Sequence, residues 1–275
     1  MQVLGTARGG APATVMCDRQ GRRRTMAEQP ATSARARCSP SGRIKGAAVC
    51  HCDRIGAEVR IGGESPAPWA RRCGTVGLVG VLVFWAGQAA LHALRTDLSV
   101  VNDYVSDYAN GPGGSLFTVS TLVHGVGNLA IAAGLGYALG RRNRAARAGV
   151  LLFALAAIGL LVAATFPTDS ADAPQTVTGL VHRVAATESF AVELAALALL
   201  ALAFRADSAW RDYLNLSLAL TVVAAIMLAW LLVAIGGGWP PGLPERAALL
   251  AFTVWELTTA VLLARGPHRL RRTLS

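Results

Sequence analysis

The sequence predicts an all-α membrane protein, a bundle of six transmembrane spans with both termini in the cytoplasm. Six apolar stretches of roughly 20 residues each follow one another, and a helix of that length crosses the hydrocarbon core of a bilayer. The arginines gather on one side of these stretches. Apolar residues make up 53% of the chain and charged residues 15%, against roughly 25% charged in soluble proteins, which favours the same class.

Each span is bounded by local signals. The predicted spans are Cys73–Leu94, Leu116–Leu139, Val150–Phe166, Val184–Phe204, Leu214–Ile235 and Ala247–Ala264. An arginine pair precedes the first span, and a Gly-Pro-Gly-Gly turn at residues 111–114 leads into the second. Pro167 stops the third because it cannot continue a helix, and arginines follow the fourth and the sixth. The residues between the fourth and fifth spans form a short connection.

The distribution of arginine predicts the orientation. One side of the spans carries Arg71, Arg72, Arg141, Arg142, Arg144, Arg147, Arg205, Arg211, Arg265, Arg269, Arg271 and Arg272. The connections on the other side hold one arginine each beside six acidic residues. Short loops rich in arginine stay in the cytoplasm, so we expect a multi-pass protein of the cell membrane whose acidic connections face outward. Residues 73–275 hold 13 basic and 11 acidic residues, a balance that argues against nucleic-acid binding.

The chain divides into three regions. Residues 1–72 show neither a helical nor a strand period, and we expect a disordered basic tail, or translated sequence upstream of the true start. Four cysteines, Cys17, Cys38, Cys50 and Cys52, lie here, but the paired spacing of structural zinc sites is missing, so no metal site is assigned. Residues 73–264 form the transmembrane domain. Residues 265–275 form a basic cytoplasmic tail that we expect to lie against anionic lipid headgroups.

The outer connections carry the first set of candidate residues. Asp103 and Asp107 are four residues apart, as are Tyr104 and Tyr108, so each pair would share one face of a short helix. The third connection begins with Phe-Pro-Thr-Asp at residues 166–169 and returns through a histidine into the fourth span. We therefore expect a polar cluster at the outer face, made of Asp103, Asp107, Tyr108, Asp169 and His182. Asp107, Asp169 and His182 are expected to lie close together.

These motifs carry a family resemblance. A Ser-Asp-Tyr-Ala run at residues 106–109, Phe-Pro-Thr-Asp at the outer end of a helix, and His182 opening the next resemble domain-of-unknown-function family 998. The resemblance covers about residues 73–265 and excludes the amino-terminal tail. It implies an α-helical bundle of six to seven spans in a prokaryotic membrane. It implies no activity and no catalytic residues.

The spans themselves contain a second set of candidates, an intramembrane polar line made of His92, His124, Asn128, Ser189, Glu193 and Glu256. Residues at helical spacing of four share a stripe, as His124 does with Asn128 and Ser189 with Glu193. Polar side chains inside a membrane are costly and usually face the bundle interior. Most of them are expected to hold helices in register through hydrogen bonds, whereas Glu193 and Glu256 more plausibly line a polar cavity.

The function predicted from these residues is broad. The first hypothesis is a small-solute or proton-coupled transporter, or a ligand-binding protein with an outward-facing pocket. A membrane-embedded enzyme of the metal-dependent hydrolase type, with its site at the outer face, is the alternative. A haem between two of His92, His124 and His182 is a third. Nucleotide-binding and hydrolase motifs are missing from the sequence. The lipid bilayer is the expected partner, nucleic acid is not, and a small-molecule ligand, a cofactor and a homo-oligomer are left open.

Overall fold

The computed structural model describes residues 68–139, 143–170 and 173–265 in full, together with six short strands before them. The strands form two separate three-stranded antiparallel sheets. They are β1 (Gln2–Gly5), β2 (Ala13–Cys17), β3 (Arg23–Arg24), β4 (Ser39–Ile44), β5 (Ala47–His51) and β6 (Glu58–Arg60). Most of the segment 1–67 lies outside the described residues, as does 266–275. The predictions of a disordered amino-terminal tail and a lipid-bound carboxyl-terminal tail therefore stay predictions.

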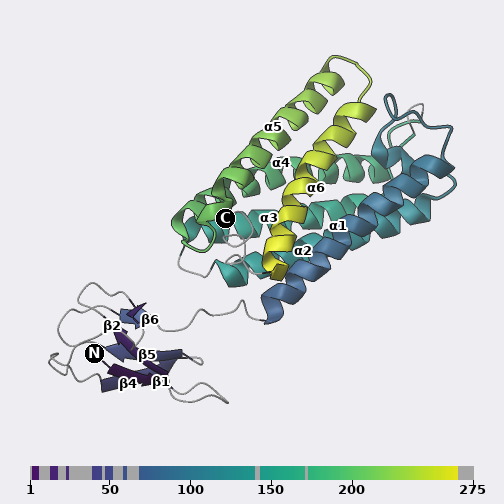
Figure 1. Ribbon diagram of the computed structural model, residues 1–275. Helices are drawn as coiled ribbons and strands as arrows, with labels where there is room; N and C mark the ends of the chain where they lie inside the picture. Colours follow the sequence, from purple (N-terminus) through teal and green to yellow (C-terminus); the bar gives the residue numbers. More distant parts are fainter. Residues whose placement is uncertain are drawn as a thin grey trace. The chain divides into compact units, whose positions relative to one another are not determined.

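The part of the chain described from residue 68 onward is a separate unit and is all-α, as the sequence predicts (Figure 1). Its long helices are α1 (Pro68–Leu94), α2 (Gly114–Ala138), α3 (Arg144–Thr165), α4 (Val177–Ala206), α5 (Leu214–Gly236) and α6 (Gly242–Arg265). Two short 3-10 helices, η2 (Val105–Ala109) and η3 (Arg211–Tyr213), lie between them. Among the described residues, these six long helices are long and apolar enough to cross a membrane.

Four helices begin well before the apolar stretches that predict them. α1, α3, α4 and α6 start five to seven residues early, and their first turns include polar residues. Asn143 accepts a hydrogen bond from the Ala146 N–H at 3.2 Å, and Thr176 accepts one from the Gly179 N–H at 3.0 Å. Such N-cap bonds satisfy N–H groups that the first helical turn leaves without partners. Hydropathy marks the membrane crossing, and the caps mark where the helix begins.

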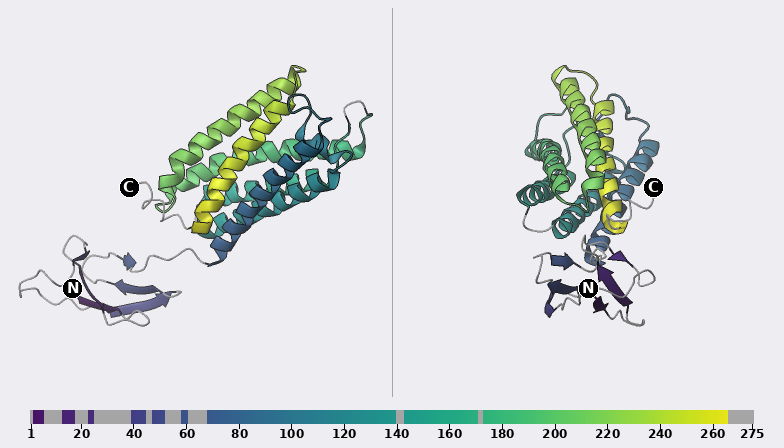
Figure 2. Two further views of the ribbon diagram at one scale, coloured as in Figure 1. Left: turned by 45° about the vertical axis from the view of Figure 1, so that its right-hand side comes forward. Right: turned by 60° about the vertical axis from the view of Figure 1, so that its left-hand side comes forward.

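The helices pack as a closed ring in which each helix contacts the next and α6 returns to α1 and α2. α5 and α6 lie side by side along one flank (Figures 1 and 2). Trp255 of α6 is fully buried at this junction, where its indole N–H donates to Ser217 Oγ of α5 at 2.9 Å. α5 leaves much of its apolar surface exposed, which suits contact with lipid acyl chains.

α1 and α2 approach each other closely at a pair of glycines. A Cβ atom built on Gly80 would lie 2.9 Å from the Cα atom of Gly127, and one built on Gly127 would lie 3.0 Å from Gly80 Cα. Only hydrogen fits between the two backbones. Small residues at such crossings let membrane helices approach closely, since lipid provides no hydrophobic force between them.

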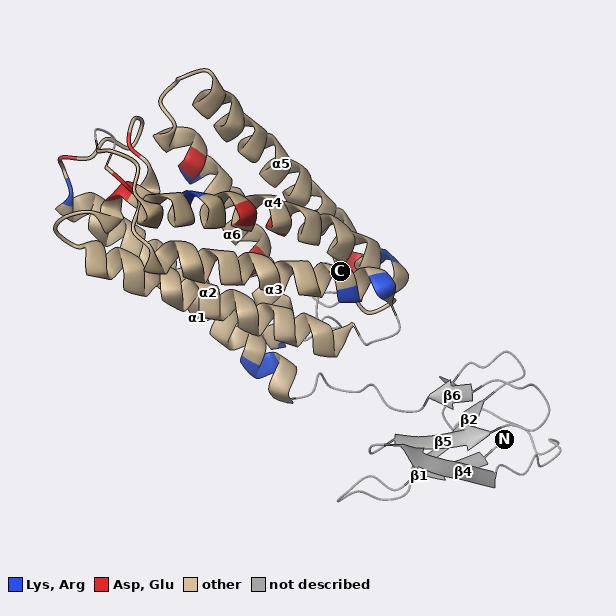
Figure 3. Cartoon of the chain, turned by 180° about the vertical axis from the view of Figure 1, so that it is seen from behind, with Lys and Arg blue, Asp and Glu red and all other residues tan. Residues whose placement is uncertain are grey.

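Three connections meet at one end of the bundle, which we call the acidic end: residues 95–113, 166–176 and 237–241. The Asn110 side chain donates to the Thr168 carbonyl at 3.1 Å, joining the first two. The Gly242 N–H donates to the Val101 carbonyl at 3.0 Å, joining the first to the start of α6. Figure 3 shows acidic residues at this end and inside the bundle, and a concentration of arginine at the other.

Candidate functional site

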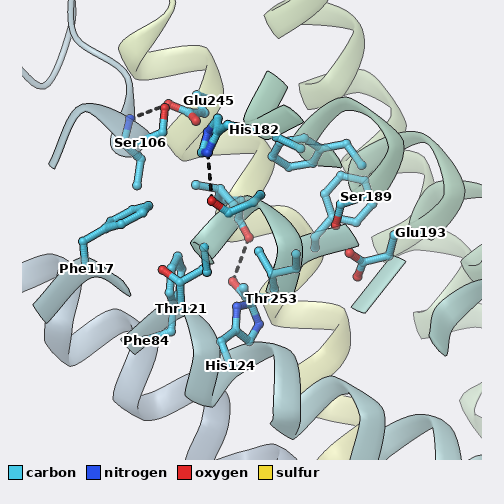
Figure 4. A pocket seen from close by; sticks show the side chains of 18 of the residues that line it. Phe84, Ser106, Phe117, Thr121, His124, His182, Ser189, Glu193, Glu245 and Thr253 are labelled. Atoms are coloured by element: carbon cyan, nitrogen blue, oxygen red, sulfur yellow. Dashed lines mark hydrogen bonds between the residues drawn. The ribbon is translucent and has the colours of Figure 1, made fainter. Parts of the chain in front are cut away.

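A cavity of about 80 Å³, with a largely apolar wall and several polar side chains, lies inside the bundle, below the acidic end. His124 and Thr121 of α2, Glu193 of α4 and Glu256 of α6 line it, and the ring of Phe84 forms part of its apolar wall. Figure 4 shows His124 and Glu193 approaching it from opposite sides. A space of this size accommodates a few water molecules or a very small solute.

The deepest polar contact in the cavity joins α2 to α6. The imidazole Nε2 of His124 lies 2.6 Å from Glu256 Oε2, and the amide of Asn128 donates to Glu256 Oε1 at 2.5 Å. Glu256 is 1% exposed, and its partners are similarly buried. The His124 ring also stacks on Phe84, with ring centroids 4.7 Å apart. The i, i+4 spacing of His124 and Asn128 puts both on the face of α2 that meets α6.

Glu193 of α4 lines the same cavity as Glu256 and is 7% exposed. Glu193 Oε1, His124 Nδ1 and Thr121 Oγ1 are buried and have no hydrogen-bond partner in the structure. The cavity therefore offers unpaired polar atoms beside two buried carboxyl groups.

The upper part of the cavity is closed by main-chain contacts. Glu245, at the start of α6, accepts a hydrogen bond from the Val105 N–H of η2 at 2.5 Å. His182 of α4 places Nδ1 2.8 Å from the carbonyl oxygens of both Ala163 and Phe166, the end of α3. A histidine donor is well suited to the unpaired carbonyls of a helix terminus.

The remaining residues of the expected outer cluster meet separate partners. Asp169 accepts from the N–H and hydroxyl of Thr176, at 3.0 and 2.6 Å, and so braces the start of α4. Asp103 Oδ2 accepts from the Ser99 N–H at 2.6 Å, and Asp107 Oδ2 from the Tyr104 N–H at 2.8 Å. The hydrogen bonds of Asp107, Asp169 and His182 thus go to different groups. A functional cluster of the three stays a prediction.

Two other candidates also have defined partners. The Tyr108 hydroxyl lies 3.2 Å from His92 Nδ1 and 3.4 Å from Arg246 Nη2, at the acidic end. The Ser189 hydroxyl donates to the Ala156 carbonyl of α3 at 3.0 Å. Ser189 therefore links two helices, while its side chain also lines the cavity. Of the intramembrane line, His124, Asn128 and Glu256 are in direct contact, and Glu193 lines the same cavity.

At the acidic end, the environment shifts the pKa values of two carboxyl groups in opposite directions. Burial raises the pKa of Asp107 above its ordinary value, although the Tyr104 N–H acts in the opposite direction. Hydrogen bonds from Thr176 lower the pKa of Asp169, which is half-buried. The folded environment therefore favours the neutral form of Asp107 and the charged form of Asp169.

Sequence reasoning missed several residues of the site. Glu245 and Arg246 served as orientation signals, yet Glu245 is buried and Arg246 Nη1 donates to the carbonyls of Val100 and Asp103, at 3.0 and 2.8 Å. Thr253 accepts from the Trp85 indole N–H at 2.9 Å. Its spacing of three residues from Glu256, on one helix face, is the signal that could have identified it.

A family comparison bears on all of these residues. The model of a family described as "protein of unknown function (DUF998)" matches residues 78–262. The chain belongs to the DUF998 family. The matched region contains the whole chain of contacts from His124 to Glu256, and six candidate spans in a DUF998 protein indicate a multi-span membrane protein. No curated protein and no solved structure shows a significant match to this DUF998 chain.

Proposed function

We propose that the protein binds a small, positively charged solute in the central cavity and exchanges it for protons across the membrane. One observation carries the proposal: the carboxyl groups of Glu193 and Glu256, from two helices, line one cavity inside the bundle, and His124 contacts the second. Ionisable residues within membrane helices are costly, and they commonly mark ion pathways and proton relays.

The charge of the cavity supports a cationic solute. Three carboxyl groups line it, those of Glu193, Glu245 and Glu256, and only two histidines, His124 and His182, can offset them. A cation entering the cavity would displace a proton from Glu193 or Glu256, because a carboxylate is then needed to balance it. Proton release and solute binding would thereby compete for one site.

The proposal includes an orientation in the cell membrane. The arginine-rich end of the bundle lies in the cytoplasm, with both termini, and the acidic end faces outward, in agreement with the positive-inside rule. A reporter fused after Ser275 is expected to be active in the cytoplasm, and one inserted near Pro174 outside it. The reverse activity at either site would overturn the orientation.

Proton exchange can be tested in liposomes that contain the purified protein and an acidic interior. Addition of sodium, potassium, methylammonium or guanidinium outside is expected to dissipate the pH gradient with at least one cation, read by a pH-sensitive dye. Glu193→Gln and Glu256→Gln should abolish the effect, because a neutral amide can neither release a proton nor balance a cation.

The matched control is Glu188→Gln. Glu188 lies on the same helix as Glu193, but a Cβ atom built on Gly159 of α3 would meet its Oε2, so it faces α3. Exchange by this variant should equal that of the wild type. The proposal fails if none of the four cations dissipates the gradient faster than in protein-free liposomes. It also fails if Glu193→Gln exchanges at the wild-type rate.

The enzyme alternative, a metal-dependent hydrolase at the outer face, has less support. Its expected ligands Asp169 and His182 direct their polar atoms at Thr176 and at the end of α3. Within residues 68–139, 143–170 and 173–265, no group of three or more His, Cys, Asp or Glu side chains could hold a metal ion. A homo-oligomer stays a prediction.

A further inference from the structure

A second cavity, of about 260 Å³, lies between α1 and α6 beneath the connection 95–113. Trp85, Gln88 and His92 of α1 and Arg246 of α6 line it, and Tyr108 contributes from η2. Ala89, also in its wall, is exposed, as is His92, so the cavity opens on the flank of the bundle. Its opening lies on the surface of a candidate membrane span, where lipid-soluble molecules have access.

Gln88 is the unexplained residue of this cavity. Its side chain is 7% exposed, and neither Nε2 nor Oε1 has a hydrogen-bond partner in the structure. An amide buried without partners costs roughly 1–3 kcal/mol per unsatisfied group, which a structural role alone does not offset. The amide provides one acceptor and two donors, all free to bind a molecule in the cavity.

The other polar groups of the cavity are mostly occupied. Arg246 Nη1 donates to the carbonyls of Val100, Asp103 and Gly242, at 3.0, 2.8 and 3.1 Å. The Tyr108 hydroxyl contacts His92 and Arg246. The indole N–H of Trp85 is bound to Thr253. The amide of Gln88 is therefore the free hydrogen-bonding group in a wall that is otherwise largely apolar.

The charges around the cavity decide the class of ligand. Arg246 is the cation in its wall, and the carboxyl groups of Asp107 and Glu245 act on it electrostatically. These two carboxyl groups offset the guanidinium charge, so an anionic headgroup gains little attraction here. A cation would meet the guanidinium group itself. The remaining class of ligand has an uncharged polar end and an apolar body that fills the rest of the cavity.

We propose that this cavity binds an uncharged, lipid-soluble molecule whose polar end carries a carbonyl or hydroxyl oxygen held by Gln88. The amide N–H donates to a ligand carbonyl, or the amide oxygen accepts from a ligand hydroxyl. Two sources share this chemistry, a neutral glycerolipid of the membrane and a free isoprenoid quinone. The site is separate from the cavity of the proposed exchange, and it stands whether or not that exchange occurs.

Photo-crosslinking of the full chain in phosphatidylcholine nanodiscs tests the proposal. The probes are diazirine derivatives of dioctanoylglycerol and of a decyl-substituted benzoquinone, with the labelled peptides read by mass spectrometry. At least one probe is expected to label α1 or α6 at this cavity, and excess unlabelled probe should remove the label. The probe that labels identifies the source.

Two variants and one control complete the test. Gln88→Leu should lower labelling about tenfold, the effect of losing one hydrogen bond in an apolar site. Ala89→Trp should block the opening and remove the label. Asn215→Leu, an exposed polar-to-apolar change at the arginine-rich end of α5, should label as the wild type does.

A stability measurement separates binding from folding. Without probe, Gln88→Leu should resist denaturant at least as well as the wild type, because it removes an unsatisfied buried amide. Labelling of Gln88→Leu within twofold of the wild type would overturn the proposal. So would the failure of both probes to label the cavity, or a Gln88→Leu variant that is less stable than the wild type.

Discussion

Replacing Glu256 should show how strongly the polar chain holds α2 against α6. In Glu256→Leu, the two hydrogen bonds from His124 and Asn128, of 2.6 and 2.5 Å, are lost together. Both donors stay buried, at 3% exposure each, without the carboxyl group that accepts from them. A hydrogen bond between membrane helices contributes about 0.6 kcal/mol on average, and up to about 1.7.

The bonds to Glu256 belong at the upper end of that range. Charge-assisted hydrogen bonds are roughly twice as strong as neutral ones, and these two lie in a region that water reaches only through a small cavity. Two such bonds amount to about 2–3 kcal/mol of unfolding free energy. Glu256→Gln keeps a side-chain oxygen for Asn128 and should cost about 1 kcal/mol.

The assay is reversible unfolding by sodium dodecyl sulfate in mixed micelles, followed by circular dichroism. A double-mutant cycle with His124→Leu isolates the pairwise term, which should be about 1 kcal/mol. Glu188→Gln, in which the replaced carboxyl has a buried oxygen without a partner, should change the unfolding free energy by less than about 0.5 kcal/mol. A cost below about 0.5 kcal/mol for Glu256→Leu, or strict additivity in the cycle, would refute the reasoning.

Two further predictions concern packing and pH. Gly127→Ala should cost about 1–3 kcal/mol of unfolding free energy because its Cβ would press on Gly80, whereas Gly236→Ala, with nothing within 4 Å, should be neutral or slightly stabilising in the same assay. Equal effects would contradict the close α1–α2 contact. Because burial raises the pKa of Asp107, the wild type should lose stability as pH rises from about 4 through that pKa. Asp107→Asn should show a smaller loss in unfolding curves at pH 4 to 7, and a slope equal to that of the wild type would contradict the prediction.

At the acidic end, local sequence patterns predict the helix boundaries but not the contacts between connections. Pro167 and the glycine-rich turn at 111–114 predict helix boundaries, and α3 ends at Thr165 while α2 begins at Gly114. The sequence could predict that Asp169 caps a helix end, but not which residue it would contact. Its partner Thr176 is seven residues away, across a connection whose path no periodicity describes.

The sequence by itself determined the six spans, their order and the helix faces that carry polar residues. The physical reason is local: a crossing needs a continuous apolar run, and residues four apart share a face whatever surrounds the helix. The tertiary structure alone decided which polar residues meet. His124 and Glu256 are 132 residues apart, and their contact depends on which helices are neighbours, how each is rotated and how closely glycine lets them approach. The tertiary structure alone also shows that the Gln88 amide has no hydrogen-bond partner in the second cavity. Whether a buried amide is paired depends on the helices packed around it, which a local sequence pattern does not describe.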